Sequence, residues 1–253
     1  MSALSLPVAA RQRGLCLSIA VLAATLLALP HAASLFHYFF PELERPLYTQ
    51  ESFANLLLSH LAIVAASSLI AMVLGAGGAI LVCRSAWRDL RPLLETLLAI
   101  SQSLPPVAVL AVAAPLIGFG ETPALIALVL YGMLPIAHGT LNGLDSVSPE
   151  LRDVARGMGM TTAQSLWKVE LPLAAPVMLA GIRTSVVINI GTAAIASTVG
   201  AKTLGLPIIV GLSGFNTAYV IQGALLVALL AIVVDQAFES LAVGIAAPSL
   251  QKS

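Results

Sequence analysis

Charged residues are scarce in this chain. They make up 9% of its 253 residues, and 58% of the residues are apolar, whereas about 25% of the residues in a soluble domain are charged. The mean hydropathy is +0.98, so the polar side chains are too few to cover a water-soluble globule. We therefore expect lipid to cover most of the surface. The formal net charge is zero, and we expect no nucleic-acid partner.

Cysteine and lysine are also rare. Cys16 and Cys83 are the only cysteines, and both fall on the side that we predict to be cytoplasmic, so neither a structural disulfide nor a metal site is expected. None of the three lysines, Lys168, Lys202 and Lys252, follows a glycine, as the lysine of a P-loop does. We therefore expect no enzyme and no cofactor in this chain. Any ATP would be hydrolysed by a partner subunit.

Six apolar segments are present, and most reach the roughly 20 residues that cross a bilayer. They cover residues 14–33, 56–82, 92–118, 123–137, 172–199 and 218–241. The fourth is long enough only if its helix continues past His138. The pattern predicts an all-α polytopic membrane protein with about six transmembrane helices, built as a single transmembrane domain over residues 1–253.

The basic residues of the connecting loops predict the orientation, because Lys and Arg concentrate on the cytoplasmic side. Only Arg45 and Lys202 fall in the loops of one side, and Arg183 lies within a helix. The other nine basic residues share the opposite side: Arg11, Arg13, Arg84, Arg88, Arg91, Arg152, Arg156, Lys168 and Lys252. Both termini are therefore predicted to be cytoplasmic.

The first apolar segment allows two interpretations. Arg11 and Arg13, the apolar run 15–29 and the small residues at 32–34 also resemble a cleavable signal peptide. We expect a retained helix, and the distribution of basic residues is consistent with either interpretation. Removal would leave five crossings and the same cytoplasmic loops.

A polar segment over residues 148–172 lies between two apolar runs. Ser148, Pro149 and Glu150 have the order of a capping hydroxyl, a first-turn proline and a first-turn acid. Thr161 and Gln164 have the spacing of a capping box, so a second helix is predicted after Gly159. Two short helices joined at glycines suit a docking surface for a soluble partner. The alternative is an ordinary interfacial loop with two chance helix caps.

The same segment contains a longer motif. Asp153-Val154-Ala155, three residues, Gly159, nine residues and Val169-x-Leu171-Pro172 resemble the EAA loop, E-A-A-x3-G-x9-I-x-L-P, of permeases in bacterial binding-protein-dependent ABC importers. Asp153 replaces the glutamate, and Val154 replaces the first alanine. The resemblance implies that this helix–turn–helix inserts into a groove of a separate ATPase. The implied coupling residues are Asp153, Ala155, Gly157, Gly159, Leu171 and Pro172.

Further segments resemble the osmoprotectant branch of these permeases, over about residues 48–239, and most closely the Yeh-type low-affinity glycine betaine system. They are SQSLPP (101–106), LIGFG (116–120), ALVLYGMLPI (127–136), ARGMGM (155–160), GIRT (181–184), ESFA (51–54) and GLSGFNTAY (211–219). The resemblance implies a type I, MetI-like permease fold in the bacterial inner membrane. It divides the chain into an N-terminal segment (1–47), a permease core (48–245) and a cytoplasmic coupling region (145–172).

The same resemblance implies partners and a solute. The partners would be an ABC ATPase, a second permease that is related or identical, and a periplasmic substrate-binding protein. The solute would be glycine betaine or a relative. Aromatic cages bind quaternary ammonium groups, yet only 5% of the residues are aromatic and no cage follows from their spacing. We therefore expect the binding protein to supply most of the solute selectivity.

Two features within the apolar segments are candidates for the translocation path. Pro105 and Pro106 remove two backbone donors and should kink or break the third segment; a gate hinge and a kink packed against its neighbours both fit. Ser185, Asn189 and Thr192 form a polar stripe at helical spacing. Such a stripe could line the path, but polar residues also join helices in membranes.

The sequence gives little support to two other classes of function. An ion-gradient-driven transporter of a small zwitterion would carry paired charges in the membrane and inverted repeats; the sequence shows only Arg183 and no obvious repeat. An intramembrane enzyme would need a catalytic group at depth, but His60 and His138 are predicted at opposite membrane faces without a supporting motif. An ATP-driven importer permease is the function we expect.

Overall fold

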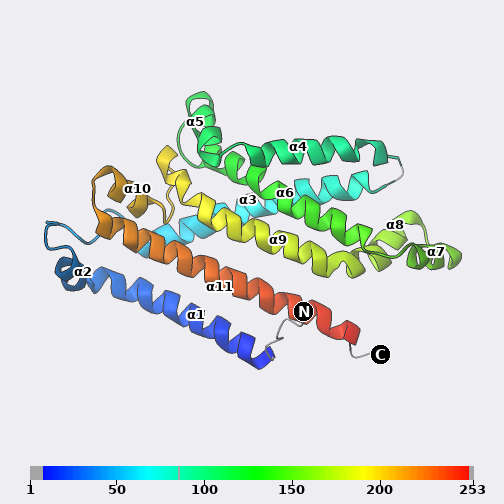
Figure 1. Ribbon diagram of the computed structural model, residues 1–253, viewed down its shortest axis with the longest axis horizontal. Coiled ribbons are helices and arrows are strands. Elements are labelled where there is room, and N and C mark those ends of the chain that lie inside the picture. Colours follow the sequence, from blue (N-terminus) through cyan, green and yellow to red (C-terminus); the bar gives the residue numbers. More distant parts are fainter. Residues whose placement is uncertain (1–7, 85, 251–253) are drawn as a thin grey trace. The chain divides into compact units, whose positions relative to one another are not determined.

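The computed structural model describes residues 8–84 and 86–250, and every regular element in these ranges is a helix (Figure 1). Lys252, used in the count of basic residues, lies outside them. The predicted all-α fold class is confirmed. The elements are α1 (Val8–Ala28), η1 (Leu29–His31), α2 (Ala33–Phe39), α3 (Phe53–Val82), η2 (Arg88–Leu90), α4 (Arg91–Ser103), α5 (Pro106–Ile117), α6 (Glu121–Asp145), α7 (Pro149–Gly157), α8 (Thr162–Ser165), η3 (Leu166–Glu170), α9 (Leu171–Ala193), η4 (Ile195–Val199), α10 (Leu206–Ser213) and α11 (Thr217–Leu250).

Within the described residues, five stretches are long and apolar enough to cross a membrane, or six if α4 and α5 form one broken span. The fourth predicted segment is long enough, because α6 continues past His138 to Asp145. The last helix begins near the predicted start at Ala218 and runs on to Leu250. The short helix α10 was not predicted.

The third predicted segment is not one helix. It divides into α4, which ends at Ser103, and α5, which begins at Pro106. Leu104 between them is extended, and Pro105 caps the second helix. Two consecutive prolines cannot donate backbone hydrogen bonds to a preceding turn, and a proline favours an extended residue before it. Of the two predicted outcomes, a kink or a break, the structure has the break.

The chain forms two compact units. The first comprises residues 8–67, Pro105–Leu128 and Val187–Ser240. In this unit α1 runs beside α11 (Figure 1), where Arg11 pairs with Glu239 at 3.5 Å and the Ser18 hydroxyl donates to Gln236 Oε1 at 2.9 Å. Whether the first segment is retained or cleaved stays a prediction.

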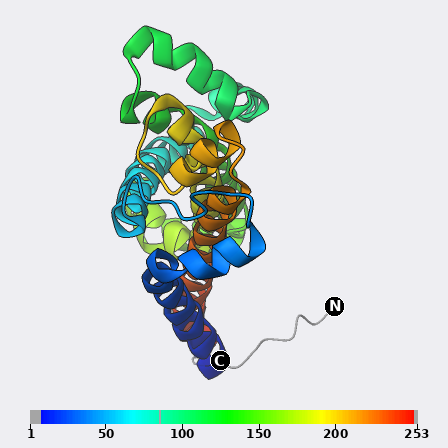
Figure 2. The ribbon, with the colours of Figure 1, turned by 90° about the vertical axis from the view of Figure 1, so that its left-hand side faces the viewer.

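Buried polar groups join the parts of this first unit. His60, fully buried on α3, accepts from the Leu204 backbone at Nδ1 (3.3 Å) and lies 3.1 Å from the Ile190 carbonyl through Nε2. Gln222 on α11 holds the loop before α3, because it accepts from the Tyr48 amide at 3.1 Å and donates to the Pro46 carbonyl at 2.7 Å. The buried hydrogen bonds of His60 indicate that it acts as a packing residue. The short helices α2 and α10 of the same unit are in the foreground of Figure 2.

The second unit comprises Ser68–Leu104, Val129–Val186 and residues 241–250. Its core has two apolar clusters, one around Ala79, Leu98 and Leu141 and one around Leu144, Val147 and Ala174. Helices α6 and α9 approach closely at Gly139 and Gly181, where a Cβ added at Gly181 would lie 2.5 Å from the Pro135 carbonyl oxygen. Small residues at such crossings let membrane helices pack backbone to backbone.

This crossing supplies a direct test of helix packing. Gly181→Ala should lower the free energy of unfolding by about 1–3 kcal/mol through overpacking, although alanine favours a helix. Gly191→Ala on the same helix is the control, because a Cβ there meets nothing within 4 Å. Thermal unfolding in detergent should show a lower midpoint for Gly181→Ala only. Equal midpoints for the two variants would contradict the close approach.

Candidate functional site

The polar segment folds as two short helices, as predicted. The first, α7, begins at Pro149 after an extended Ser148. One detail of the prediction is wrong, because the Ser148 side chain makes no capping hydrogen bond to the helix backbone. Hydrogen bonds from its own backbone and from the Ser148 side chain instead hold the pKa of the Glu150 carboxyl below its usual range. The acid of the first turn therefore stays ionised at the positive end of the helix.

The end of α7 is a Schellman motif. The Gly159 amide donates to the Arg156 carbonyl at 2.9 Å, and the Met160 amide donates to the Ala155 carbonyl at 3.1 Å. Gly159 has a φ of 79°, in the left-handed region that glycine adopts without steric cost. This conformation turns the chain from α7 into α8.

The two glycines of this turn can be separated by one substitution each. A Cβ at Gly157 or at Gly159 would meet nothing within 4 Å, and only Gly159 has a positive φ. Gly159→Ala should therefore lower the free energy of unfolding by about 1–2 kcal/mol, and Gly157→Ala should not. Uptake should fall with the first variant and be retained with the second. Equal losses of uptake in the two variants would show that uptake does not depend on the left-handed conformation of Gly159.

The second helix starts with the predicted capping box. The Gln164 amide donates to Thr161 Oγ1 at 3.2 Å, and the Thr161 amide donates to Gln164 Oε1 at 2.9 Å. After α8 comes the five-residue π-helical segment η3, which leads directly into α9. Such π-helical turns often occur at functional sites. Here the segment ends on the buried Glu170.

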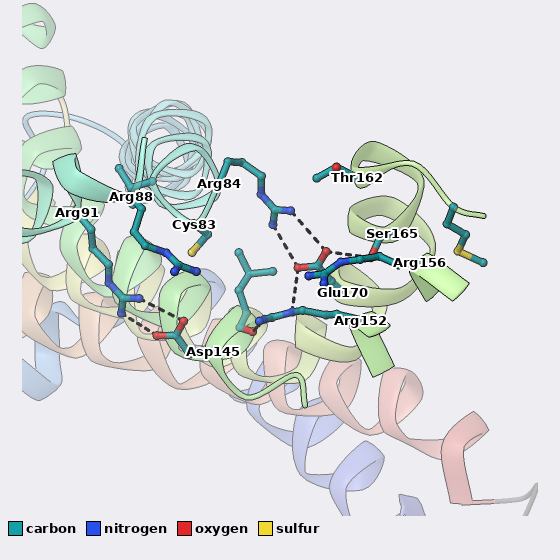
Figure 3. Close-up of a pocket in the computed structure, with 13 residues that line it drawn as sticks. Cys83, Arg84, Arg88, Arg91, Asp145, Arg152, Arg156, Thr162, Ser165 and Glu170 are labelled. Carbon is teal, nitrogen blue, oxygen red and sulfur yellow. Dashed lines mark hydrogen bonds and ion pairs between the residues drawn. The ribbon is translucent and has the colours of Figure 1, made fainter. Parts of the chain in front are cut away.

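Glu170 is the central ionic group of this region, and sequence reasoning assigned it no role. Its side chain is 7% exposed. It accepts from Arg84 at 3.3 and 3.5 Å and from the Ser165 hydroxyl at 3.2 Å, and it lies 3.4 Å from Nε of Arg152 (Figure 3). Arg152 also donates to the Leu144 carbonyl. One carboxylate thus connects the end of α3, α7 and α8 at the base of α9.

The outer face of α7 is apolar although it is exposed. Leu151, Val154 and Met158 are 44%, 57% and 65% exposed, and their spacing places them on one side of the helix. Ala155 is buried, and Asp153 and Arg156 form an exposed ion pair at 3.0 Å. An amphipathic helix with its apolar side outward has the form of a helix that docks in a groove of a partner.

The remaining predicted coupling residues lie at the start of α9. Leu171 is half-buried and packs with Leu144, Val147 and Ala174. Pro172 is exposed and lies near the start of α9, directly after the π-helical segment η3. The motif therefore combines residues that build the turn, Gly159 above all, with Leu171, which packs the start of α9 against the end of α6.

The polar stripe on α9 makes contacts within the chain. Ser185 is fully buried and donates to the Gly132 carbonyl of α6 at 2.8 Å. Asn189 is fully buried and lies 3.5 Å from Ser67 Oγ of α3. Thr192 donates to the Ile188 carbonyl of its own helix at 2.9 Å. These bonds show that Ser185 and Asn189 join helices; a role in the translocation path stays a prediction.

Three aromatic residues, Tyr48, Phe53 and the sequence-distant Tyr219, meet in the first unit. Tyr48 lies 5.8 Å from Phe53 and 5.5 Å from Tyr219 between ring centroids. The rings pack on one another rather than around a space, and burial and the nearby Glu51 carboxylate raise the pKa of Tyr48. Phe215, four residues before Tyr219, is 90% exposed. The expectation that the binding protein supplies most of the solute selectivity stays a prediction.

Comparison with known families identifies the class. The profile of the family "Binding-protein-dependent transport system inner membrane component" matches residues 78–245. The chain belongs to this family. It is a multi-pass permease subunit of an ATP-driven importer in the inner membrane, and permeases of this kind have no ATPase site of their own. Such a permease implies an ATPase and a substrate-binding protein as partners.

The chain is similar to permeases named for osmoprotectant or choline transport. The chain is 41% identical to the osmoprotectant import permease protein OsmW of Salmonella typhimurium, over 72% of this chain and 86% of that protein. It is 42% identical to OsmY of the same organism, over 70% and 75%. It is 47% identical to the choline transport system permease protein OpuBB of Bacillus subtilis, over 54% and 63%.

Solved structures agree on the fold. An inward-facing structure of the MetNI methionine ABC transporter superposes with a TM-score of 0.68 at 24% identity, over 78% of this chain and 99% of that chain. A second crystal form gives a TM-score of 0.67 at 23% identity, over 74% and 93%. The predicted MetI-like permease fold is thus confirmed, and the ion-gradient-driven alternative is not supported.

Proposed function

We propose that this permease imports an osmoprotectant, glycine betaine or a closely related quaternary ammonium compound. The observation that carries the proposal is the identity of 41–47% to permeases named for osmoprotectant or choline transport. Relatives named for carnitine and for glycine betaine, at 36–43%, support the same chemical class.

The coupling to ATP hydrolysis is proposed to run through α7 and α8. The exposed apolar face of Leu151, Val154 and Met158 would sit in a groove of the ATPase, with Asp153 at its edge. Apolar anchors that become fully desolvated carry most of the energy of such interfaces. Glu170 would then transmit a movement of α7 to α3 and α9, because it binds side chains from the end of α3 and from α7 and lies at the start of α9.

The remaining parts of the transporter follow from this function. One chain with five or six spans is expected to pair with a second permease, related or identical, so that a path can form between them. A periplasmic binding protein would deliver the solute. Pro105, Pro106, Ser185, Asn189 and Thr192 remain the candidates for residues along the path.

Uptake in cells tests the solute class. A strain that lacks its other osmoprotectant transporters, and in which the gene for this chain is deleted, should regain uptake of radiolabelled glycine betaine or choline when the gene is restored. Unlabelled carnitine, choline and glycine betaine should compete, whereas methionine and histidine should not. If the restored gene supports uptake of no quaternary ammonium compound, the proposed solute class is wrong.

A further inference from the structure

The second unit contains a cavity of about 590 Å³ that is lined by arginines (Figure 3). Arg84 follows α3, Arg88 lies in η2 and Arg91 begins α4, while Arg152 and Arg156 lie on α7. Only two carboxylates line the same space, Asp145 and Glu170. The lining therefore has more guanidinium groups than carboxylates.

Within the described residues, four of the five guanidinium groups around the cavity form ion pairs with carboxylates, and one does not. Asp145 binds Arg91 at 2.7 Å, and Glu170 pairs with both Arg84 and Arg152. Two acids outside the lining contribute as well: Asp153 binds Arg156 at 3.0 Å, and Glu95 binds Arg91 at 2.9 Å. Arg88 pairs with no carboxylate in residues 8–84 and 86–250. It is exposed and faces the cavity.

The neutral groups of the lining do not offset this excess. Burial, and to a lesser degree the Asp145 carboxylate, raise the pKa of the Cys83 thiol, so Cys83 stays uncharged at neutral pH. The exposed Thr162 hydroxyl can donate a further hydrogen bond. Guanidinium groups bind phosphate oxygens through paired hydrogen bonds, and the volume falls in the range of about 300–1,000 Å³ of small-molecule sites.

We propose that this cavity binds the phosphate group of a phosphate ester with a net negative charge at the cytoplasmic face of the permease. Two sources share this chemistry, the headgroup of an anionic phospholipid and a soluble phosphate compound. The lipid is favoured by Trp87, Leu90 and Leu93, which are 53%, 43% and 55% exposed on the same segment as Arg88 and Arg91. Aromatic and apolar side chains next to arginines are typical of the bilayer interface, where basic pockets bind lipid headgroups.

The site is separate from the solute proposal, and its test does not depend on uptake. The full chain is placed in nanodiscs of phosphatidylcholine at constant ionic strength. Two probes are then titrated, phosphatidylglycerol as a fraction of the bilayer and soluble sn-glycerol 3-phosphate. Binding is followed by the thermal midpoint and by native mass spectrometry. Arg88→Gln is compared with Arg13→Gln, an exposed arginine at the predicted cytoplasmic end of α1.

We expect Arg88→Gln to weaken binding about tenfold, as the loss of one charge-assisted hydrogen bond does, and Arg13→Gln to leave binding unchanged. Arg88→Lys keeps the charge but not the paired hydrogen-bond geometry, so its affinity for the probe should lie between those of Arg88→Gln and Arg13→Gln. Arg88-dependent binding of phosphatidylglycerol alone identifies the lipid as the source, and equal binding of glycerol phosphate identifies a soluble ester. Binding of neither probe, or binding that does not depend on Arg88, overturns the proposal.

Discussion

Glu170→Gln is expected to destabilise the permease by about 3 kcal/mol, because it leaves two guanidiniums without their common carboxylate. Removing one partner of a buried ion pair costs about 3–5 kcal/mol. The side chains of Arg84 and Arg152 are 22% and 30% exposed, so water compensates part of the loss and the lower value applies. Thermal unfolding of the purified protein should show the shift, and uptake should fall with it.

Glu95→Gln is the matched control for this substitution. Glu95 also pairs with an arginine, at 2.9 Å and one helical turn apart, but its side chain is 43% exposed. Surface pairs of this kind contribute about 0.3–0.5 kcal/mol, and Arg91 keeps its second partner, Asp145. Equal shifts for the two variants would contradict the central position of Glu170.

Val154→Asp should separate the permease from its ATPase without unfolding it. Val154 is 57% exposed, so a charged side chain changes the stability of the chain itself by no more than about 0.5 kcal/mol. In the proposed interface the same charge would be buried among apolar groups. Loss of a central anchor costs about 2 kcal/mol or more, which is roughly a 30-fold loss of affinity.

The measurement is the amount of ATPase that co-purifies with the tagged chain in mild detergent, together with the uptake rate. Gln12→Asp, also at an exposed position on the predicted cytoplasmic side, controls for the added charge. Retention of the ATPase by Val154→Asp would contradict the docking of α7. Loss of the ATPase in both variants would point to a general effect of charge.

Local patterns predicted the local structure of the coupling region well. The spacing of Thr161 and Gln164 gave the capping box, because both bonds lie within one turn. The two adjacent prolines gave the break between α4 and α5, since neither can donate a backbone bond. Hydropathy predicted the long helices, because a helix that crosses a bilayer needs about 20 apolar residues in a row.

The contacts over long sequence separations were not predictable. Glu170 reaches Arg84 only because the π-helical turn and the end of α3 lie together, and its sequence neighbours give no sign of that. The Ser148 hydroxyl was expected to cap α7, but a serine before a helix has more than one partner within reach. Ser185 and Asn189 formed a polar stripe in the sequence, yet only the structure shows which helices they contact.

Reconstitution tests the central claim, that this chain transports its solute with energy from a separate ATPase bound at α7. Proteoliposomes would hold the permease with its co-purified partner subunits, with ATP supplied on the ATPase side and binding protein with labelled glycine betaine on the other. We expect accumulation that needs ATP, persists when ion gradients are abolished by ionophores, and is lost in Val154→Asp. Uptake by the permease alone, driven by an imposed ion gradient and unaffected by Val154→Asp, would contradict the claim.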